Sequence, residues 1–374
     1  MNNQRINNRI LLASVLKPID DTRMFEKMGR SLSEASGYEV FIVGYSSKNP
    51  PKETDSLHFF SLKKFSRLSF GRLMASVNIF KIAYQVKPKV LIVNTHELLI
   101  VAVLNRIFFG TRIIYDIQEN YWRNILQTNA FPKVIRPFLA AWVRLKEKLT
   151  SPLFHWNFLA EKGYEKELGF VGKKYTVIEN KVRIPEDFQR KPDTTKTRLL
   201  FTGTLAESTG VFEAIQLAKS LHQVEPAIEL LIIGFCALPQ TLKDIKLAIQ
   251  DCSFITLIGG DSLIPHSQIM EAIATSDFGL VAYRLSTHTE NSIPTKLYEY
   301  LGCQLPILLQ NHQPWVEMCT PYSAFINVNF ANPDCISILL QMKNSKFYIS
   351  SPTDVTWASE EVKLLNVIDA LLNV

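Results

Sequence analysis

The sequence predicts an α/β protein of two Rossmann-like domains, each built on a parallel sheet and facing the other across a central cleft. Its 374 residues exceed the length at which one hydrophobic core usually stops growing. Short runs rich in Val and Ile alternate with helical patterns, which is typical of parallel sheets. A polar, Pro-bearing stretch at 180–197 interrupts this alternation and is expected to be the interdomain linker.

The first domain is predicted over residues 1–185. Its strands are expected at apolar runs bounded by turn or polar residues, namely Ile10–Leu16, Glu39–Gly44, Val90–Asn94, Arg112–Asp116, Trp156–Ala160 and Tyr175–Glu179. Helices are expected between them, for example over Thr22–Ala35 and Leu98–Phe108. A closing helix at 358–374 carries one apolar stripe, so we expect it to dock back on this domain.

The second domain is predicted over residues 198–350. Its strands are expected at Arg198–Thr202, Ile228–Ile233, Phe254–Leu257, Phe278–Val281 and Pro306–Leu309. Helices are expected over Val211–Leu221 and Thr295–Leu301. Ligands of open α/β sheets bind outside the carboxyl ends of the strands, so functional residues are sought there.

Composition narrows the class of protein. The five cysteines all lie in the second half without CxxC spacing, which fits neither a zinc site nor a disulfide framework, and a reduced cytosolic compartment is expected. No apolar segment reaches the length of a membrane span, so the protein is expected to be soluble or peripheral. Residues 1–190 carry 30 Lys and Arg against 17 Asp and Glu, a net charge of +13, whereas the remainder carries −7.

The most informative stretch is 293–307, IPTKLYEYLGCQLPI. Pro294 presets a helix start, which places Lys296 in the first turn. A cation there opposes the helix dipole unless an anion binds at the same helix end, and a diphosphate is such an anion. Glu299 lies on the same face three residues later and can accept two hydroxyl hydrogen bonds, as a ribose offers. Alternatively, the two residues form an ordinary surface ion pair.

Three stretches together resemble the glycosyltransferase family 4 enzymes ("group 1"), whose fold is GT-B. They are the 293–307 run, the strand–Gly–loop–Gly–helix sequence LFTGTLAESTGV at 200–211, and IGG at 258–260 followed by ATSDFGL at 274–280. The resemblance covers most of the chain and is strongest from 198 to 318. It implies a nucleotide-sugar site in the second domain, with donor-binding residues at Gly203, Thr204, Thr209, Gly259, Glu290, Asn291, Lys296, Leu297 and Glu299.

The sequence departs from the family at three donor positions. Thr204 and Thr209 stand where the family usually has an Arg and a Lys on the donor diphosphate. Each missing cation removes a charge-assisted hydrogen bond of about 1.5–3 kcal/mol. The first of the family's two spaced glutamates would fall at Asn291, with Glu290 beside it.

In the first domain, polar side chains follow two predicted strands, in VNTHEL at 93–98 and IYDIQENY at 114–121. His96 and Glu119 are the candidate catalytic residues, since imidazole exchanges protons near pH 7 and a carboxylate can orient an acceptor hydroxyl. A structural His96 is an equal alternative. The second stretch resembles the family's Tyr-Asp-x-His-Glu run, with Gln118 at the His position. Candidate acceptor-side residues are Lys17, Arg23 and Asp116.

Basic and aromatic residues interleave at 63–73 and 131–149, a pattern suited to an anionic membrane surface. An amphipathic helix packed on the sheet is the alternative. Nucleic acid is not an expected partner, because no nucleic-acid-binding motif accompanies the charge.

The resemblance implies transfer with retention of anomeric configuration and no cofactor or metal ion. We expect a glycosyltransferase at the inner face of a bacterial membrane, acting on a lipid-linked glycan in surface polysaccharide assembly. A non-catalytic nucleotide-sugar-binding protein and a nucleotide-sugar epimerase of the same fold are the alternatives.

Overall fold

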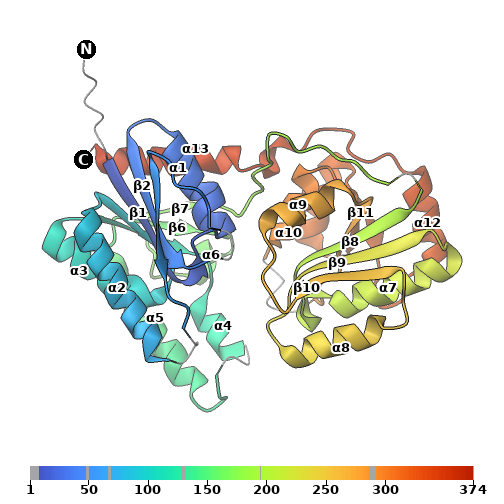
Figure 1. Ribbon diagram of the computed structural model, residues 1–374, viewed down its shortest axis with the longest axis horizontal. Coiled ribbons are helices and arrows are strands. Elements are labelled where there is room, and N and C mark those ends of the chain that lie inside the picture. Colours follow the sequence, from blue (N-terminus) through green and yellow to red (C-terminus); the bar gives the residue numbers. More distant parts are fainter. Residues whose placement is uncertain are drawn as a thin grey trace. The chain divides into compact units, whose positions relative to one another are not determined.

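The computed structural model describes residues 8–47, 50–65, 69–127, 131–193, 195–285 and 292–373. The chain forms two compact units (Figure 1). Unit 1 comprises Met1–Asn180 with Ala358–Val374, and unit 2 comprises Lys181–Trp357. Each unit is a parallel sheet with helices on both faces, which confirms the predicted α/β class.

The sheet of unit 1 has seven strands in the order β3-β2-β1-β4-β5-β6-β7, all parallel. Their bounds are β1 Asn8–Pro18, β2 Tyr38–Tyr45, β3 Leu57–Leu62, β4 Val90–Val93, β5 Arg112–Ile117, β6 Trp156–Leu159 and β7 Tyr175–Val177. The central strands are buried on both faces, and this is why they are continuous apolar runs in the sequence.

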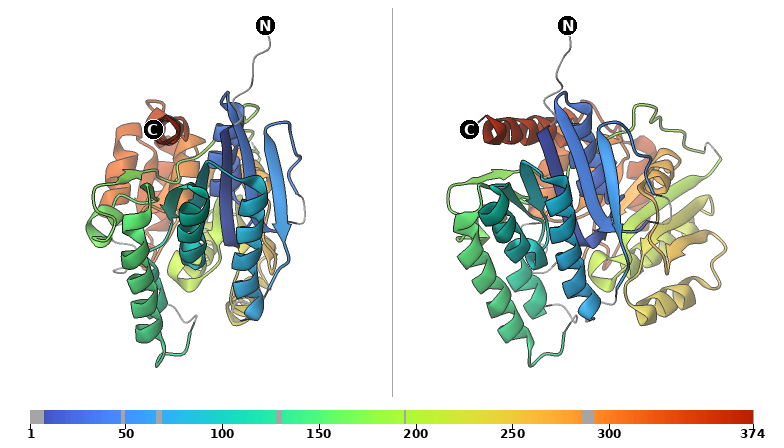
Figure 2. Two further views of the ribbon diagram at one scale, coloured as in Figure 1. Left: turned by 90° about the vertical axis from the view of Figure 1, so that its left-hand side faces the viewer. Right: turned by 60° about the vertical axis from the view of Figure 1, so that its left-hand side comes forward.

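Helices cover both faces of this sheet (Figure 2). One face carries α2 (Phe70–Val86), α3 (Leu99–Phe109) and α5 (Arg136–Thr150); α3 packs on both of the others. The opposite face carries the helical turn η1 (Thr22–Gly29), α1 (Arg30–Glu34) and α13 (Ala358–Leu372). The smaller helical segments are η2 His96–Leu98, α4 Tyr121–Gln127, η3 Ser151–Leu153 and α6 Tyr164–Glu167.

The sheet of unit 2 has six parallel strands in the order β10-β9-β8-β11-β12-β13. They are β8 Thr197–Thr204, β9 Ile228–Phe235, β10 Ile255–Gly260, β11 Phe278–Val281, β12 Ile307–Gln310 and β13 Phe325–Val328. The helices are α7 Val211–Val224, α8 Pro239–Ile249, α9 His266–Ala274, α10 Thr295–Gly302, α11 Gln313–Cys319 and α12 Cys335–Asn344, with short turns η4 Glu207–Thr209, η5 Thr320–Tyr322 and η6 Thr353–Val355.

The C-terminal helix α13 is part of unit 1. Its Leu364 and Ile368 are fully buried, and the hydroxyl of Tyr38 donates to Asp369. The buried Glu360 accepts from the backbone N–H of Glu179 at 3.0 Å. These contacts attach the C-terminal segment to the first 180 residues of unit 1.

Two features of the fold differ from the sequence prediction. The edge strands β3 and β13 have no counterpart in it, because each is short and only partly buried. The stretch expected to be a linker lies on unit 2: Val182 donates to the carbonyl of Val355, and Arg190 donates to those of Ser276 and Gln304. Within the described ranges, no helix combines the length and hydropathy needed to span a bilayer.

Candidate functional site

Three glycines stand in register at the carboxyl ends of neighbouring strands of unit 2. Gly203 of β8 pairs with Gly234 of β9, which pairs with Gly259 of β10. A Cβ on Gly234 would lie 1.8 Å from the carbonyl oxygen of Gly203, so only glycine fits there. Gly203 has φ 95°, and its missing Cβ would lie 3.8 Å from Cε of Lys296. Because Gly203 has no side chain, the space next to the Lys296 side chain is left open.

Lys296 is a buried cation at the first turn of α10. Its Nζ lies 3.8 Å from the ring centroid of Phe201 and 5.2 Å from that of Tyr283. Among the described residues Nζ has no hydrogen-bond partner. Burial lowers the pKa of this ammonium to about 7, and the carboxylate of Glu299 acts in the opposite direction. Buried groups with strongly shifted pKa values are frequent at functional sites.

Glu299 lies one turn further along the same helix and is 8% exposed. Its Oε1 is 3.1 Å from Nε2 of His266, the first residue of α9. The contact ties the starts of α9 and α10 together at the carboxyl edge of the sheet. A carboxylate held in this way can accept hydroxyl hydrogen bonds from a ligand.

Other predicted donor residues have different surroundings. Thr204 is exposed at the end of β8. The hydroxyl oxygen of Thr209 lies 2.8 Å from the carbonyl oxygen of Thr204 and accepts from the N–H of Ala206, so it shapes the loop between β8 and α7. Leu297 is fully buried in the core. Glu290 and Asn291 lie outside the described residues.

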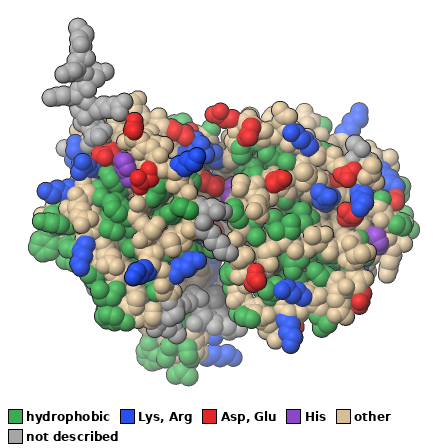
Figure 3. All heavy atoms as spheres, viewed as in Figure 1, with side chains coloured by type: hydrophobic (Ala, Val, Ile, Leu, Met, Phe, Trp, Pro, Cys, Tyr) green, Lys and Arg blue, Asp and Glu red, His purple; other side chains and the backbone are tan. Residues whose placement is uncertain are grey.

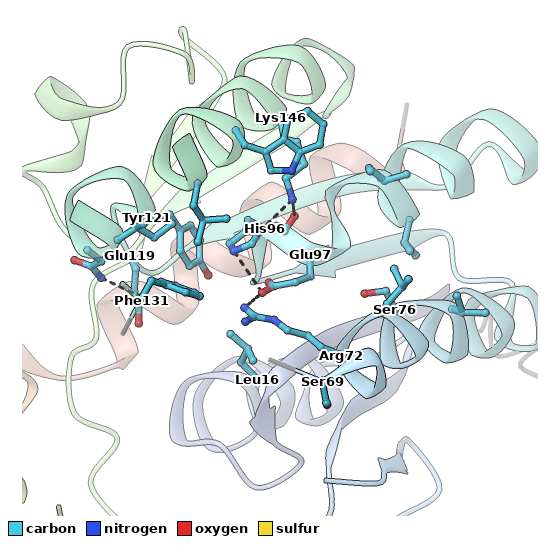
Figure 4. Close-up of a pocket in the computed structure, with 18 of the residues that line it drawn as sticks. Leu16, Ser69, Arg72, Ser76, His96, Glu97, Glu119, Tyr121, Phe131 and Lys146 are labelled. Atoms are coloured by element: carbon cyan, nitrogen blue, oxygen red, sulfur yellow. Dashed lines mark hydrogen bonds and ion pairs between the residues drawn. The ribbon is translucent and has the colours of Figure 1, made fainter. Parts of the chain in front are cut away.

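Unit 1 contains a second candidate site, a pocket of about 780 Å³ (Figure 4). One part of it lies near the ends of β1, β4 and β5, where Leu16, His96 and Glu119 line it. From there it extends between α2, α3 and α5, whose lining side chains are mostly apolar. Both candidate catalytic residues therefore lie in one pocket.

His96 is held in the pocket wall by contacts on both ring nitrogens. Nζ of Lys146 lies 3.2 Å from Nδ1 and can only donate, so Nδ1 accepts and the ring proton is on Nε2. Nε2 lies 3.4 Å from Oε1 of Glu97, which also pairs with Arg72. Burial first, and then Lys146 and Arg72, lower the pKa of His96 to about 3, so the ring is neutral at pH 7. These contacts favour a positioning role over proton exchange.

Solved structures of glycosyltransferases match this chain over nearly its whole length. Sucrose-phosphate synthase from Thermosynechococcus elongatus has a TM-score of 0.72 at 12% identity, with 98% of this chain and 100% of that chain covered. HepE from Anabaena in complex with UDP-glucose has a TM-score of 0.62 at 11% identity, covering 97% and 99%. The catalytic domain of starch synthase IV from Arabidopsis thaliana has 0.61 at 10% identity, covering 98% and 100%. The chain has the GT-B fold.

The predicted GT-B fold is therefore confirmed. No protein-family model matches the sequence, and no curated protein sequence matches it either. Membership of family 4 stays a prediction, since identities of 10–12% carry the fold alone.

The predicted acceptor-side residues of this GT-B chain have different environments. Arg23 and Asp116 are both buried and pair with each other, with Nη2 to Oδ1 at 2.6 Å. Arg23 also donates to the carbonyl of Ile178 at 2.8 Å. Their polar atoms are thus engaged within unit 1. Lys17 is partly exposed and lies 3.5 Å from Asp21.

Glu119 is the more exposed of the two candidate catalytic residues. It is exposed at the end of β5, and its Oε2 accepts from Nδ2 of Asn124 at 3.0 Å. Both residues line the pocket. An exposed carboxylate beside an amide suits hydrogen bonding to hydroxyl groups.

Sequence reasoning missed two residues of the unit 2 site. Gly234 lies at the end of an apolar strand. A glycine at such a position indicates that another backbone segment or a ligand approaches closely, so the sequence did contain a signal for it. His266 starts a helix soon after Gly259 and Gly260, but its contact with Glu299 spans 33 residues and no local pattern marks it. Among the described residues, no group of three His, Cys, Asp or Glu side chains could hold a metal ion.

Proposed function

We propose that this chain is a retaining glycosyltransferase that takes its sugar from a nucleotide-sugar donor bound at unit 2. The observation that carries the proposal is the buried Lys296 ammonium, which lacks a hydrogen-bond partner among the described residues and lies beside Gly203. A donor diphosphate would supply the missing anion. In support, HepE was solved with UDP-glucose, and starch synthase IV with ADP and acarbose.

In this proposal the residues of unit 2 stabilise the leaving group. Lys296 stabilises the negative charge that develops on the diphosphate as the bond between the sugar and the diphosphate breaks. Backbone N–H groups near Gly203 also stabilise this charge. Glu299, oriented by His266, accepts hydrogen bonds from the ribose hydroxyls. Glu119 orients the acceptor hydroxyl. No metal ion takes part, so activity should survive EDTA, and the product anomer seen by NMR should match that of the donor.

The outer helical face of unit 1 supports a membrane-bound acceptor. We use this name for the solvent side of α2, α3, α4, α5 and the turns beside them. Seven of its large apolar side chains are more than three-fifths exposed: Phe70, Leu73, Ile107, Phe108, Val134, Phe138 and Leu149. Hydrophobic and basic side chains lie together over α2 and α3 in Figure 3. Exposed apolar clusters of this kind mark interaction sites, membranes included.

The charge of this face fits an anionic lipid surface. Segments 70–109 and 121–153 carry eleven Lys and Arg and only two acidic residues, Glu97 and Glu147. Both acids point inward: Glu97 pairs with Arg72, and Glu147 is 2% exposed. Burial raises the pKa of Glu147 to about 7, which lowers its negative charge further. Each basic residue near an anionic leaflet contributes about 1 kcal/mol. We therefore propose a lipid-linked glycan acceptor at the cytoplasmic face of the membrane, in surface polysaccharide assembly.

Vesicle binding tests this surface. The protein is expected to sediment with vesicles that contain phosphatidylglycerol, less with pure phosphatidylcholine, and less at high salt. Phe138→Glu, at a side chain 76% exposed in α5, should reduce binding at least tenfold. The matched control is Ile336→Glu, at a side chain 66% exposed in α12 of unit 2. Equal loss in both variants would contradict the assignment of the face.

Nucleotide binding is expected to take up a proton. At pH 8 the Lys296 amine, with its pKa near 7, is mostly neutral in the free protein. A bound diphosphate favours the ammonium and raises that pKa, so affinity should fall as the pH rises above 7. Titration calorimetry with a nucleoside diphosphate in two buffers of different ionisation enthalpy measures the uptake, expected to approach one proton. Lys296→Met should abolish it and Lys343→Met should retain it; uptake unchanged in Lys296→Met would exclude Lys296 as its source.

A transfer assay tests the function itself. The protein is incubated with a panel of nucleotide sugars and detergent-extracted membrane lipids, and lipid-bound sugar is measured. Transfer from one donor supports the proposal. Tight donor binding without turnover from any extract favours a non-catalytic binding protein, with Thr204 and Thr209 as the reason. Release of an altered free nucleotide sugar favours an epimerase.

A further inference from the structure

The pocket of unit 1 changes in character along its length. Glu119 and Asn124 line it near the strand ends, where side chains can meet hydroxyl groups. About two to three turns along α2 and one to two turns along α3, the lining becomes mostly apolar, with Val77, Phe80 and Leu104. A site with a polar end and an apolar end matches an amphiphile, and its volume of about 780 Å³ lies in the range of small-molecule sites.

The apolar part of the pocket is continuous with the outer helical face. Leu73, Ile100 and Trp142 line the pocket and are also 61%, 54% and 56% exposed. A hydrocarbon chain could pass from a bilayer into the pocket along these side chains without crossing water. Burying the chain and these side chains together is favourable, because both remove apolar area from water.

The cations in the pocket wall contact other groups of the wall. Arg72 pairs with Glu97, and Lys146 donates to Nδ1 and to the carbonyl of the neutral His96 (Figure 4). The lining holds two cations, Arg72 and Lys146, and two acids, Glu97 and Glu119, so its formal charges cancel and it calls for no charged ligand. An uncharged hydrocarbon chain meets this condition.

We infer that this pocket binds the hydrocarbon chain of the acceptor lipid, with the acceptor's hydroxyl groups toward Glu119 and the chain between α2, α3 and α5. The inference rests on the proposed function, since it assumes that the acceptor is lipid-linked. It adds that the lipid is held in a specific pocket of unit 1 and not merely adsorbed with the membrane surface.

Binding of neutral single-chain amphiphiles tests the pocket without any turnover. Octyl and decyl glucoside are titrated into the full chain by calorimetry, below their critical micelle concentrations. Each buried methylene strengthens binding about threefold to fourfold, so decyl glucoside is expected to bind roughly tenfold more tightly than octyl glucoside. Val77→Trp fills the apolar part and should remove this gain. Met74→Trp is the matched control, because both side chains are 39% exposed on α2 and Met74 does not line the pocket.

The inference is overturned if binding does not saturate, if the gain with chain length is absent, or if both tryptophan variants behave alike. Ile100→Trp gives a second, independent filling from α3 should Val77→Trp fail to fold. Failure of the proposed function has a different signature: no donor gives transfer, while the chain-length gain and its loss in Val77→Trp persist. In an active enzyme, Val77→Trp should raise the KM for the lipid acceptor at least tenfold and leave the KM for the donor unchanged.

Discussion

Lys296→Ala is expected to lower kcat/KM for sugar transfer by about a hundredfold to a thousandfold, the effect of removing one preorganised group that stabilises charge in a transition state. The loss should fall mainly on kcat, because the diphosphate gains negative charge as the glycosidic bond breaks. Glu299→Gln should cost about tenfold to a hundredfold, seen mainly as weaker nucleotide binding, since one charge-assisted hydrogen bond is weakened.

Stability measurements separate this result from misfolding. Burial lowers the pKa of Lys296 from 10.5 to about 7, so the folded state disfavours the ammonium. That penalty is present in full below pH 7 and disappears as the pH rises toward 10.5. Lys296→Ala should therefore leave the free energy of unfolding at pH 7 unchanged or higher. Lys343→Ala, which removes an exposed cation of the same unit, is the control with unchanged kcat/KM. A variant that retains a tenth or more of the parent's kcat/KM would remove Lys296 from the mechanism.

Breaking the buried pair of Arg23 and Asp116 is expected to destabilise unit 1 by about 3–5 kcal/mol, because the remaining charge stays buried without its partner. Asp116 also accepts from Gln118 at 2.7 Å, and Arg23 donates to the side chain of Asn180 at 2.9 Å, so these contacts are disturbed as well. Urea unfolding of Arg23→Met and Asp116→Asn, followed by amide exchange of β1 and β5, reports on this unit alone.

Two further variants show whether the loss of stability comes from the unpaired buried charge. Arg9→Ala removes the cation of an exposed pair with Glu39, and should cost at most about 1 kcal/mol. The double variant Arg23→Met/Asp116→Leu should be more stable than either single variant, because no unpaired charge is left. Single variants that cost no more than Arg9→Ala would show that the pair is dispensable.

The fold was predictable because its signals are local. Parallel strands buried on both faces leave continuous apolar runs; β11 has the predicted bounds, and α13 begins at the predicted residue. The shared position of Lys296 and Glu299 in the first turns of α10 was predictable from their spacing along one helix, while their roles in donor binding stay a prediction. Contacts between distant segments were not: Arg23 meets Asp116 across 93 residues, and the sequence shows only two separate charges near strand ends. For the same reason, the sequence did not predict the burial of His96 or its contact with Lys146, which is 50 residues away.

The return of the chain to unit 1 at Ala358 makes unit 2 an insertion within unit 1. During synthesis, unit 2 emerges as one continuous segment and can fold as soon as it is complete. Unit 1 must wait for α13, which is made 177 residues after the rest of that unit. At about 5–20 residues per second, the interval is roughly 9–35 s. Throughout it, the part of unit 1 against which Leu364 and Ile368 pack lacks these two buried side chains, so we expect it to be more exposed. A chain truncated before 358 should therefore contain a complete unit 2 and an aggregation-prone unit 1.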